Sequence, residues 1–145
     1  MNASIIGVDV GSKRIGLAIA EHVLLPAMPL ATIRHESRDK DVRRIAELAS
    51  ERSAATIVVG YPLALDGSRG PAARSMDRFI EELRAAFSGD VVAVDERMTT
   101  GAASKRLLQG GLRPSRRRAL VDRVAAVEIL ESYLARRRAS FDRCE

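Results

Sequence analysis

The sequence predicts an α/β fold in which a mixed five-stranded sheet is flanked by helices. Short apolar runs rich in valine and isoleucine alternate with longer segments whose apolar residues recur at helical spacing. The first two runs lie close enough to form a hairpin, and the later runs are short and wholly apolar, which is typical of buried parallel strands. This order of elements indicates a sheet that begins antiparallel and continues parallel.

The first half of the chain supplies three strands and one helix. Residues 4–10 and 14–20 are apolar runs on either side of a Gly11-Ser12 turn, and residues 28–33 favour a third strand. Residues 39–53 place apolar side chains at helical spacing between charged positions. We therefore expect a strand hairpin, a third strand and an amphipathic helix.

The second half continues the alternation of strands and helices. The β-branched composition of residues 56–60 and 91–94 predicts two buried parallel strands. Pro71 can open the helix between them, because proline suits the first helical turn. Two further helices are expected at 99–108 and at about 118–137.

The composition limits the chain to one domain, residues 1–145. A length of 145 residues, 46% hydrophobic and 30% charged, suits a globular protein with one core. No apolar run approaches the length of a membrane span, and Asp9 and several glycines interrupt the apolar stretch near the N-terminus. We therefore expect neither a membrane segment nor a signal peptide. We expect a cytoplasmic location.

The cysteine and histidine content disfavours a disulfide and a zinc site. Cys144 is the single cysteine, and His22 and His35 are the only histidines. A metal in this chain would be held by carboxylates, which points to Mg²⁺ or Mn²⁺.

Positive charge indicates a nucleic-acid partner. Lysine and arginine total 24 against 19 acids, a net charge of +5, and nearly all the basic residues are arginines, which bind phosphate through paired hydrogen bonds. A general enrichment in arginine is the alternative explanation. Arg113 and Arg116–Arg118 form a basic segment between the last two predicted helices, whereas Arg136–Arg138 at the predicted end of the last helix suit its dipole.

Acidic residues follow the ends of two predicted strands. Asp9 closes the first strand, and Asp95 and Glu96 close the last one. Ligands of open α/β sheets bind at these carboxyl ends, so the acids converge there if the strands are neighbours. Asp122 shares a helical stripe with apolar residues and is expected to face the sheet, where a metal ion would offset the cost of burying it.

Each acid also has a structural explanation. Asp9 could cap a turn, Asp95 and Glu96 could be a solvated strand end paired with arginines, and Asp122 could favour the start of its helix. The functional interpretation rests on all of them occurring together.

The segment 59–71 is a second candidate site. It leaves a buried strand and offers glycines, the Ser68 hydroxyl, Arg69 and then a helix N-terminus, all suited to a phosphate oxygen. An ordinary strand-to-helix connection is the alternative.

Four segments together resemble the YqgF-type family. They are Asp9-Val10-Gly11-Ser12-Lys13-Arg14-Ile15-Gly16, Val59-Gly60-Tyr61-Pro62 with Leu65-Asp66-Gly67-Ser68-Arg69-Gly70, Asp95-Glu96-Arg97-Met98-Thr99-Thr100, and Asp122-Arg123-Val124-Ala125-Ala126 with Ile129-Leu130. The match keeps motif order over nearly the whole chain. Members are small bacterial proteins with a ribonuclease H-like fold, described as candidate Holliday junction resolvases and as nucleases that process the 5′ end of the 16S ribosomal RNA precursor. This chain has Tyr61 where the family usually has leucine, and we expect this difference to affect only a local contact.

The resemblance implies a two-metal nuclease site. Asp9, the pair Asp95 and Glu96, and Asp122 would hold two Mg²⁺ or Mn²⁺ ions about 4 Å apart for phosphodiester hydrolysis. Strand alternation places Glu96 on the face opposite to Asp95, which favours Glu96, but the face that looks at the metals stays open. Both acids are therefore candidates.

Basic and hydroxyl side chains near the acidic motifs are the candidate nucleic-acid contacts, with a more distant patch after residue 112. They are Lys13, Arg14, Ser68, Arg69, Arg97, Arg113, Arg116 and Arg117.

Several functions stay open from the sequence. A structured RNA precursor and branched DNA are both candidate substrates, and cleavage of a symmetric junction would favour a homodimer. The Asp-x-Gly motif also resembles the phosphate loop of the actin and sugar-kinase fold, although the chain has room for only one of the two domains of such proteins. A non-catalytic nucleic-acid-binding module is the third alternative.

Overall fold

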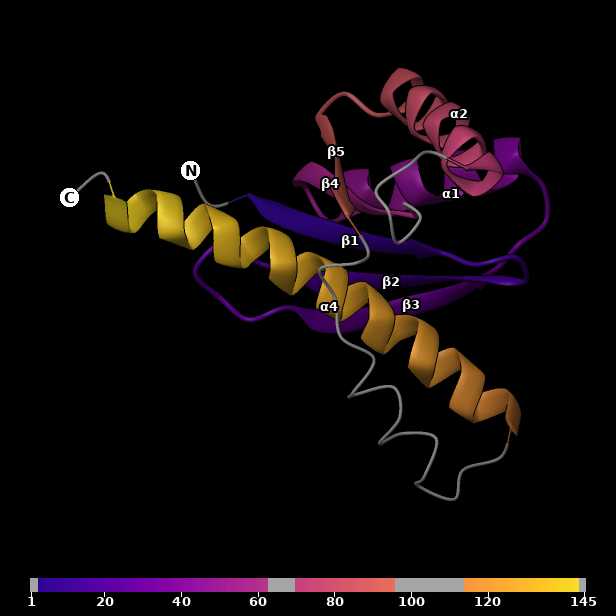
Figure 1. The fold of residues 1–145 in the computed structure, drawn as a ribbon, viewed down its shortest axis with the longest axis horizontal. Helices are drawn as coiled ribbons and strands as arrows, with labels where there is room; N and C mark the ends of the chain where they lie inside the picture. Colours follow the sequence, from indigo (N-terminus) through magenta and orange to yellow (C-terminus); the bar gives the residue numbers. More distant parts are fainter. Residues whose placement is uncertain (1–2, 63–69, 96–113, 144–145) are drawn as a thin grey trace.

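The computed structural model describes residues 3–62, 70–95 and 114–143, and for residues 114–122 and 141–143 it describes the backbone only. Figure 1 shows the arrangement of the elements. In chain order they are β1 (Ser4–Val10), β2 (Arg14–Ala20), β3 (Met28–Arg34), α1 (Arg38–Glu51), β4 (Ala54–Tyr61), α2 (Pro71–Ala86), β5 (Asp90–Asp95) and α4 (Pro114–Arg143).

The five strands form one mixed sheet in the order β3-β2-β1-β4-β5. The hairpin pairs β1 with β2 antiparallel, and β3 continues on the far side of β2, also antiparallel. On its other side β1 pairs with β4 in parallel, and β4 pairs with β5 in parallel. The predicted sheet is therefore confirmed, with β1 at its centre.

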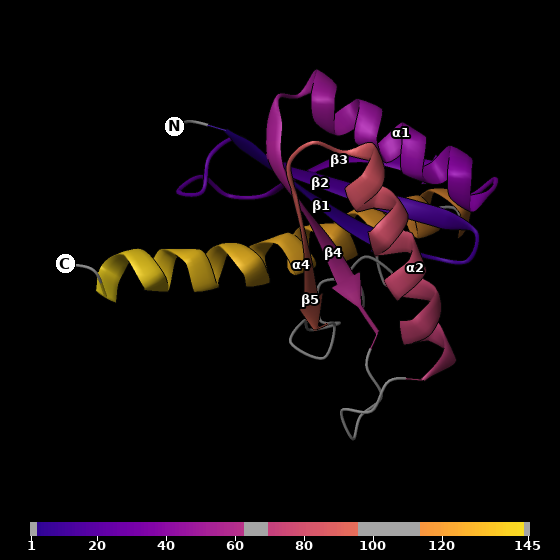
Figure 2. The same ribbon diagram turned by 90° about the horizontal axis from the view of Figure 1, so that it is seen from above.

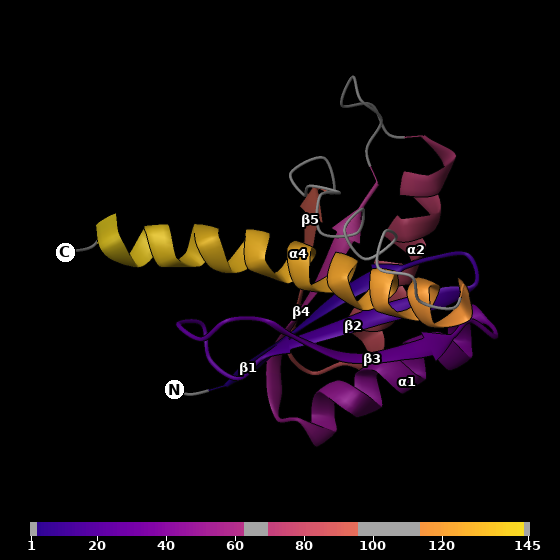
Figure 3. The same cartoon turned by 90° about the horizontal axis from the view of Figure 1, so that it is seen from below.

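Helices cover both faces of the sheet. Figure 2 shows α1 and α2 on one face, and Figure 3 shows α4 crossing the opposite face. Even-numbered residues of β1, such as Ile6 and Val8, enter the core under α1 and α2, whereas Ile5 enters the core under α4. This alternation follows from the period of two along a strand. Among the described helices, none combines the length and the apolar composition of a membrane span.

The contact between α4 and β1 is unusually close. A Cβ atom added at Gly7 would lie 2.7 Å from Leu130 Cβ and 2.9 Å from the carbonyl oxygen of Ala126. Both distances are below those of ordinary van der Waals contact, so only glycine allows the helix to approach the strand at this point. Figures 1 and 3 show α4 running in the opposite direction to β1.

The first two strands have their predicted bounds, the next three strands and α1 differ from prediction by one or two residues, and α4 differs most. The strands predicted at 4–10 and 14–20 have these bounds in the structure, and α2 opens at Pro71. The last helix, expected at 118–137, instead spans Pro114–Arg143. The predicted helix at 99–108 lies outside the described residues.

The longer α4 corrects two interpretations of its arginines. Arg116–Arg118 lie within the first turns of this helix, not in a connection between helices, because Pro114 can open the helix at its first turn. Arg138 does not end the helix. Its guanidinium donates to the carbonyl oxygens of Val23 (2.9 Å) and Leu25 (2.8 Å), so it holds the β2–β3 connection against α4.

Candidate metal and nucleic-acid site

Asp9 lies at the carboxyl end of the central strand, on the face covered by α4. It follows Gly7 by two residues and therefore shares its face. Directly opposite Asp9 on β2 is Gly16, and beside it on β4 is Gly60, the residue after Val59, which pairs with Val8. The half-buried carboxylate thus has a glycine on each neighbouring strand. Neither neighbour adds a side chain to this row, an arrangement that suits close approach of a ligand to the backbone.

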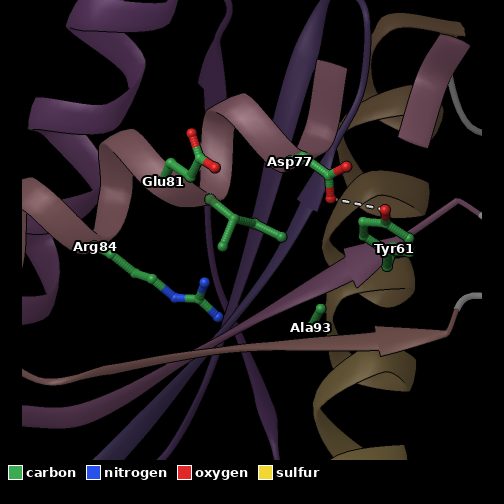
Figure 4. Close-up of a pocket in the computed structure, with 6 residues that line it drawn as sticks. Tyr61, Asp77, Glu81, Arg84 and Ala93 are labelled. Carbon is green, nitrogen blue, oxygen red and sulfur yellow. Dashed lines mark hydrogen bonds between the residues drawn. The ribbon is translucent and has the colours of Figure 1, made fainter. Parts of the chain in front are cut away.

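Asp95 lies on the opposite face of the sheet. On β5, Val94 belongs to the core under α4, whereas Val91 belongs to the core under α1 and α2, so Asp95 shares the face of Val91. Its partner on β4 is Tyr61, whose hydroxyl donates to Asp77 Oδ1 on α2 at 2.7 Å. Figure 4 shows Tyr61 pointing toward Asp77 on this side of the sheet. The structure therefore does not bring Asp95 together with Asp9.

Tyr61 helps to line a cavity of about 340 Å³ between α2 and β5, together with Asp77, Glu81, Arg84 and Ala93. Arg84 crosses to the edge strand and donates to the carbonyl oxygen of Val91 at 3.1 Å. The tyrosine that replaces the usual leucine of the YqgF-type pattern thus joins β4 to α2 through a polar contact, on the face away from Asp9.

The backbone of Asp122 lies on the Asp9 side of the crossing between α4 and β1. Ala126, which contacts Gly7, is one helical turn after Asp122, and Asp9 is two residues after Gly7. One turn of helix and two residues of strand each advance about 5–7 Å. Because the helix and the strand run in opposite directions, these two steps lead to the same end of the sheet. Asp9 and Asp122 are therefore on one face and at one end of it.

The apolar stripe that was expected to accompany Asp122 is present. Ala126 and Ile129 are fully or almost fully buried, and Tyr133 packs against the same core. The side chain of Asp122 itself, and the whole of Glu96, lie outside the described part of the chain.

Two of the predicted nucleic-acid contacts lie where the hairpin turns. Lys13 is exposed in the β1–β2 turn, and its carbonyl oxygen accepts from the His35 backbone N–H at 2.9 Å. Arg14, at the start of β2, stands directly opposite Arg34 on β3. These residues give the turn next to Asp9 a positive charge, which suits a phosphate backbone.

For the other predicted nucleic-acid contacts, the structure describes the backbone alone or nothing. Arg116 and Arg117 lie on α4, with their backbone alone described. Ser68, Arg69, Arg97 and Arg113 lie outside the described residues.

Hard cations fit the donor chemistry of Asp9, an oxygen ligand at a strand end. Among the side chains that the structure describes, no three histidine, cysteine, aspartate or glutamate residues gather as a metal cluster. The other predicted ligands, Glu96 and Asp122, are not among these side chains, because theirs lie outside the described part of the chain.

Sequence reasoning did not identify the roles of Gly7, Gly16 and Gly60. Gly16 and Gly60 stand within the quoted motifs, but their alignment beside Asp9 appears only with the strand register. Counting residues by parity along β1 would have placed Gly7 and Asp9 on one face.

Glu128, on α4, is a half-buried acid that sequence reasoning also missed. Burial raises the pKa of its carboxyl above the ordinary value. A raised pKa in the folded state means that stability is greatest below the ordinary pKa and is lost as the pH rises through the folded value. Glu128→Gln is therefore expected to raise the melting temperature slightly at pH 7, and to leave it unchanged below about pH 4.

Thermal unfolding of Glu128→Gln at both pH values, beside the wild-type protein, checks this prediction. The exposed Glu47 on α1 provides the matched control, since Glu47→Gln should give no gain. An equal gain in both variants, or a gain that persists at the lower pH, would contradict the role of burial.

Comparison with known proteins places this arrangement in a family. A family described as "RuvX: Holliday junction resolvase" matches residues 3–136. The chain is 40% identical over 139 residues to a protein of Chloroflexus aurantiacus named "Putative pre-16S rRNA nuclease", covering 96% of this chain and 91% of that protein. It is 42% identical over 134 residues to a protein of the same name from Anaeromyxobacter, covering 92% and 98%.

Solved structures share the fold at low sequence identity. The structure of T. thermophilus RuvC in complex with Holliday junction substrate aligns with a TM-score of 0.59 and 14% identity over 94% of this chain and 96% of that one. The fowlpox virus Holliday junction resolvase aligns with a TM-score of 0.55 and 15% identity over 91% and 98%. The fold is thus ribonuclease H-like, and on the family match and the 40% identity to its relatives the chain belongs to the RuvX family.

Proposed function

We propose that this protein is a metal-dependent endonuclease that hydrolyses phosphodiester bonds, and that its substrate is the 5′ region of the 16S ribosomal RNA precursor. The observation that carries the proposal is the placement of Asp9, at the end of the central strand between two glycines and on the same face and end as Asp122. The names of the relatives from Chloroflexus and Anaeromyxobacter support the choice of substrate. Such a substrate implies work in the cytoplasm.

In this proposal Asp9, Glu96 and Asp122 hold two Mg²⁺ or Mn²⁺ ions. Bound there, the ions would lower the pKa of an attacking water and stabilise charge on the leaving oxygen. Strands β1 and β5 are separated by β4 alone, so their backbones are about 10 Å apart. At this separation a carboxylate on β1 and one that follows the end of β5 could share a pair of ions. Gly60, which pairs with Val94 on β5, adds no side chain to the row of Asp9.

Asp95 and Glu96 are distinguished by the face of the sheet. Asp95 stands beside Tyr61, on the α2 side, so in this proposal it is not a metal ligand. Glu96→Gln is expected to lower cleavage by more than about a hundredfold, as the loss of a metal ligand should. Asp95→Asn is expected to lower it by less than about tenfold.

Cleavage of the same labelled RNA at a fixed Mg²⁺ concentration compares these two variants. Circular dichroism shows whether both are folded. A large loss in Asp95→Asn with full activity in Glu96→Gln would reverse the assignment of the ligand.

Lys13 and Arg14 are proposed to bind substrate phosphates beside the metal site. Ser68, Arg69 and Arg97 extend this surface in the proposal, with Arg113, Arg116 and Arg117 as a more distant patch. Arginine and lysine on a phosphate backbone supply affinity without reading sequence. We therefore expect binding to weaken steeply with salt.

The test of the proposed function is cleavage of a labelled RNA that spans the 5′ precursor segment of 16S RNA. We expect cleavage with Mg²⁺ or Mn²⁺ and none with excess chelator. Binding without cleavage under any metal condition would favour the non-catalytic alternative. Phosphoryl transfer from ATP to a small molecule would favour the kinase alternative, which the match over residues 3–136 does not support.

Holliday junction resolution is the second candidate, because the family description names it. Resolution requires two symmetric cuts and hence two copies of the site. Paired cuts in a labelled four-way junction, with a dimer in light scattering, would support this candidate. Cleavage of the RNA precursor by a monomer, with the junction left intact, would exclude it.

A further inference from the structure

A cavity of about 380 Å³ lies on the face of the sheet opposite to Asp9. It is bounded by the β1–β2 turn, the start of α1 and the early turns of α2. Its volume is within the range of small-molecule sites, about 300–1,000 Å³. Val10, Met76 and Phe79 give it an apolar wall, and Ser12, Arg38 and Ser75 give it polar groups.

His35 is the polar side chain of this cavity whose orientation is fixed by a buried partner. Its Nδ1 is hydrogen-bonded to Oδ2 of Asp41, whose side chain is only 5% exposed. The other oxygen of Asp41 accepts from the Glu36 backbone N–H at 3.2 Å. The buried carboxylate therefore fixes the orientation of the ring and places a proton on Nδ1, as carboxylates do behind functional histidines.

The second ring nitrogen of His35 remains available. Within the described part of the chain, Nε2 has no hydrogen-bond partner, and the side chain is 42% exposed. A histidine used solely to anchor the connection between β3 and α1 needs only its Nδ1 contact. An oriented ring that lines a cavity with its other nitrogen available is suited to a ligand.

The groups around the ring are hydrogen-bond donors. Arg38 lies 3.6 Å from Glu82 in an ion pair whose side chains are both about 40% exposed, and it also lines the cavity, so its guanidinium lies within reach of a ligand. Ser12, from the β1–β2 turn, and Ser75, from α2, add hydroxyls to the lining. Asp41 accepts from the ring and from the Glu36 N–H, so its negative charge is offset when the His35 ring is protonated.

We infer that this cavity binds a phosphate group, with Arg38 and His35 as its main contacts and Asp41 as the positioning residue. In its protonated form the ring donates from Nδ1 to Asp41 and from Nε2 to a phosphate oxygen. The phosphate belongs either to a nucleic-acid strand that also reaches Asp9, or to a free phosphate or nucleotide. The first source rests on the proposed function, whereas binding of inorganic phosphate does not depend on it.

The two histidines allow a direct test by nitrogen-15 NMR. We use the Asp9→Asn variant without metal, so that the result does not depend on cleavage, and titrate inorganic phosphate. The His35 Nε2 resonance is expected to shift with saturation, while His22, which accepts from the Leu24 N–H in the β2–β3 connection, stays unchanged. An unmoved His35 at about 10 mM phosphate, or equal shifts in both rings, would overturn the inference.

Variants separate a ligand contact from a structural anchor. Arg38→Ala should weaken phosphate binding about tenfold, as should Asp41→Asn through loss of ring orientation. Glu82→Gln releases Arg38 from its ion pair and should leave binding unchanged or tighter. Unchanged binding in both Arg38→Ala and His35→Asn would refute the site even if Asp41→Asn unfolds.

Two short oligonucleotides that differ only in a 5′ phosphate identify the source. Shifts of His35 with either strand at lower concentrations than inorganic phosphate support a nucleic-acid phosphate. Shifts with inorganic phosphate and none with either strand assign the cavity to a free phosphate or nucleotide.

Discussion

Asp9→Asn is expected to abolish cleavage of the RNA precursor while the protein still binds it. Asparagine keeps the size of the side chain but removes the negative charge that a hard cation needs. The two glycines beside Asp9 offer no other oxygen ligand from their side chains. We therefore expect a loss of more than about a hundredfold in the single-turnover cleavage rate. Binding, which rests on lysine and arginine contacts, should change by less than about threefold.

The matched control for this variant is Asp90→Asn. Asp90 is an exposed acid at the amino end of β5. It therefore lies at the end of the parallel strands that is opposite to the proposed site. It should cleave at the wild-type rate. Isothermal titration with Mn²⁺ adds a readout independent of activity, since Asp9→Asn should lose heat of binding and Asp90→Asn should not. Equal cleavage by Asp9→Asn and the wild-type protein would remove Asp9 from the metal site.

The strand pattern was predictable because each strand carries its own local signal. The runs at 4–10 and 14–20 are bounded by a glycine turn, and their bounds are those of β1 and β2. What the sequence left open was the face on which each acid stands. Alternation separates Asp95 from Glu96, but the choice between them needs Val94 to be placed under α4 and Tyr61 beside Asp95. Only the packing of the helices on the sheet shows which face each of these residues is on.

The last helix was predicted too short for a related reason. Apolar periodicity marks only the part of a helix that packs on a core. The turns at Arg116–Arg118 and after Leu134 carry few apolar residues, so the pattern ends before the helix does. The pairing of His35 with Asp41 was likewise not predictable, because nothing in the spacing of two polar residues indicates that one of them is buried.

Gly7→Ala is expected to destabilise the protein and to reduce cleavage more than the loss of stability explains. The added methyl group would lie 2.7 Å from Leu130 Cβ and 2.9 Å from the Ala126 carbonyl oxygen, both atoms held by the helix itself. Overpacking of this kind costs about 1–3 kcal/mol. Relief requires α4 to move away from β1. That movement would carry Asp122 away from Asp9, and a displacement of about 1 Å in such a site can cost a hundredfold in rate.

Gly70→Ala is the matched control, since a Cβ atom added at Gly70 has no described atom within 4 Å. Its φ of −86° is open to alanine, so only a small change in stability is expected. Denaturant unfolding measures the stability of both variants, and single-turnover cleavage by Gly7→Ala is compared with that of the wild-type protein well below the melting temperature of the variant. A Gly7→Ala variant that is less stable but cleaves at the wild-type rate would show that the close crossing serves the fold alone. Wild-type stability in that variant would show that α4 and β1 separate without cost, and would remove the argument that places Asp122 beside Asp9.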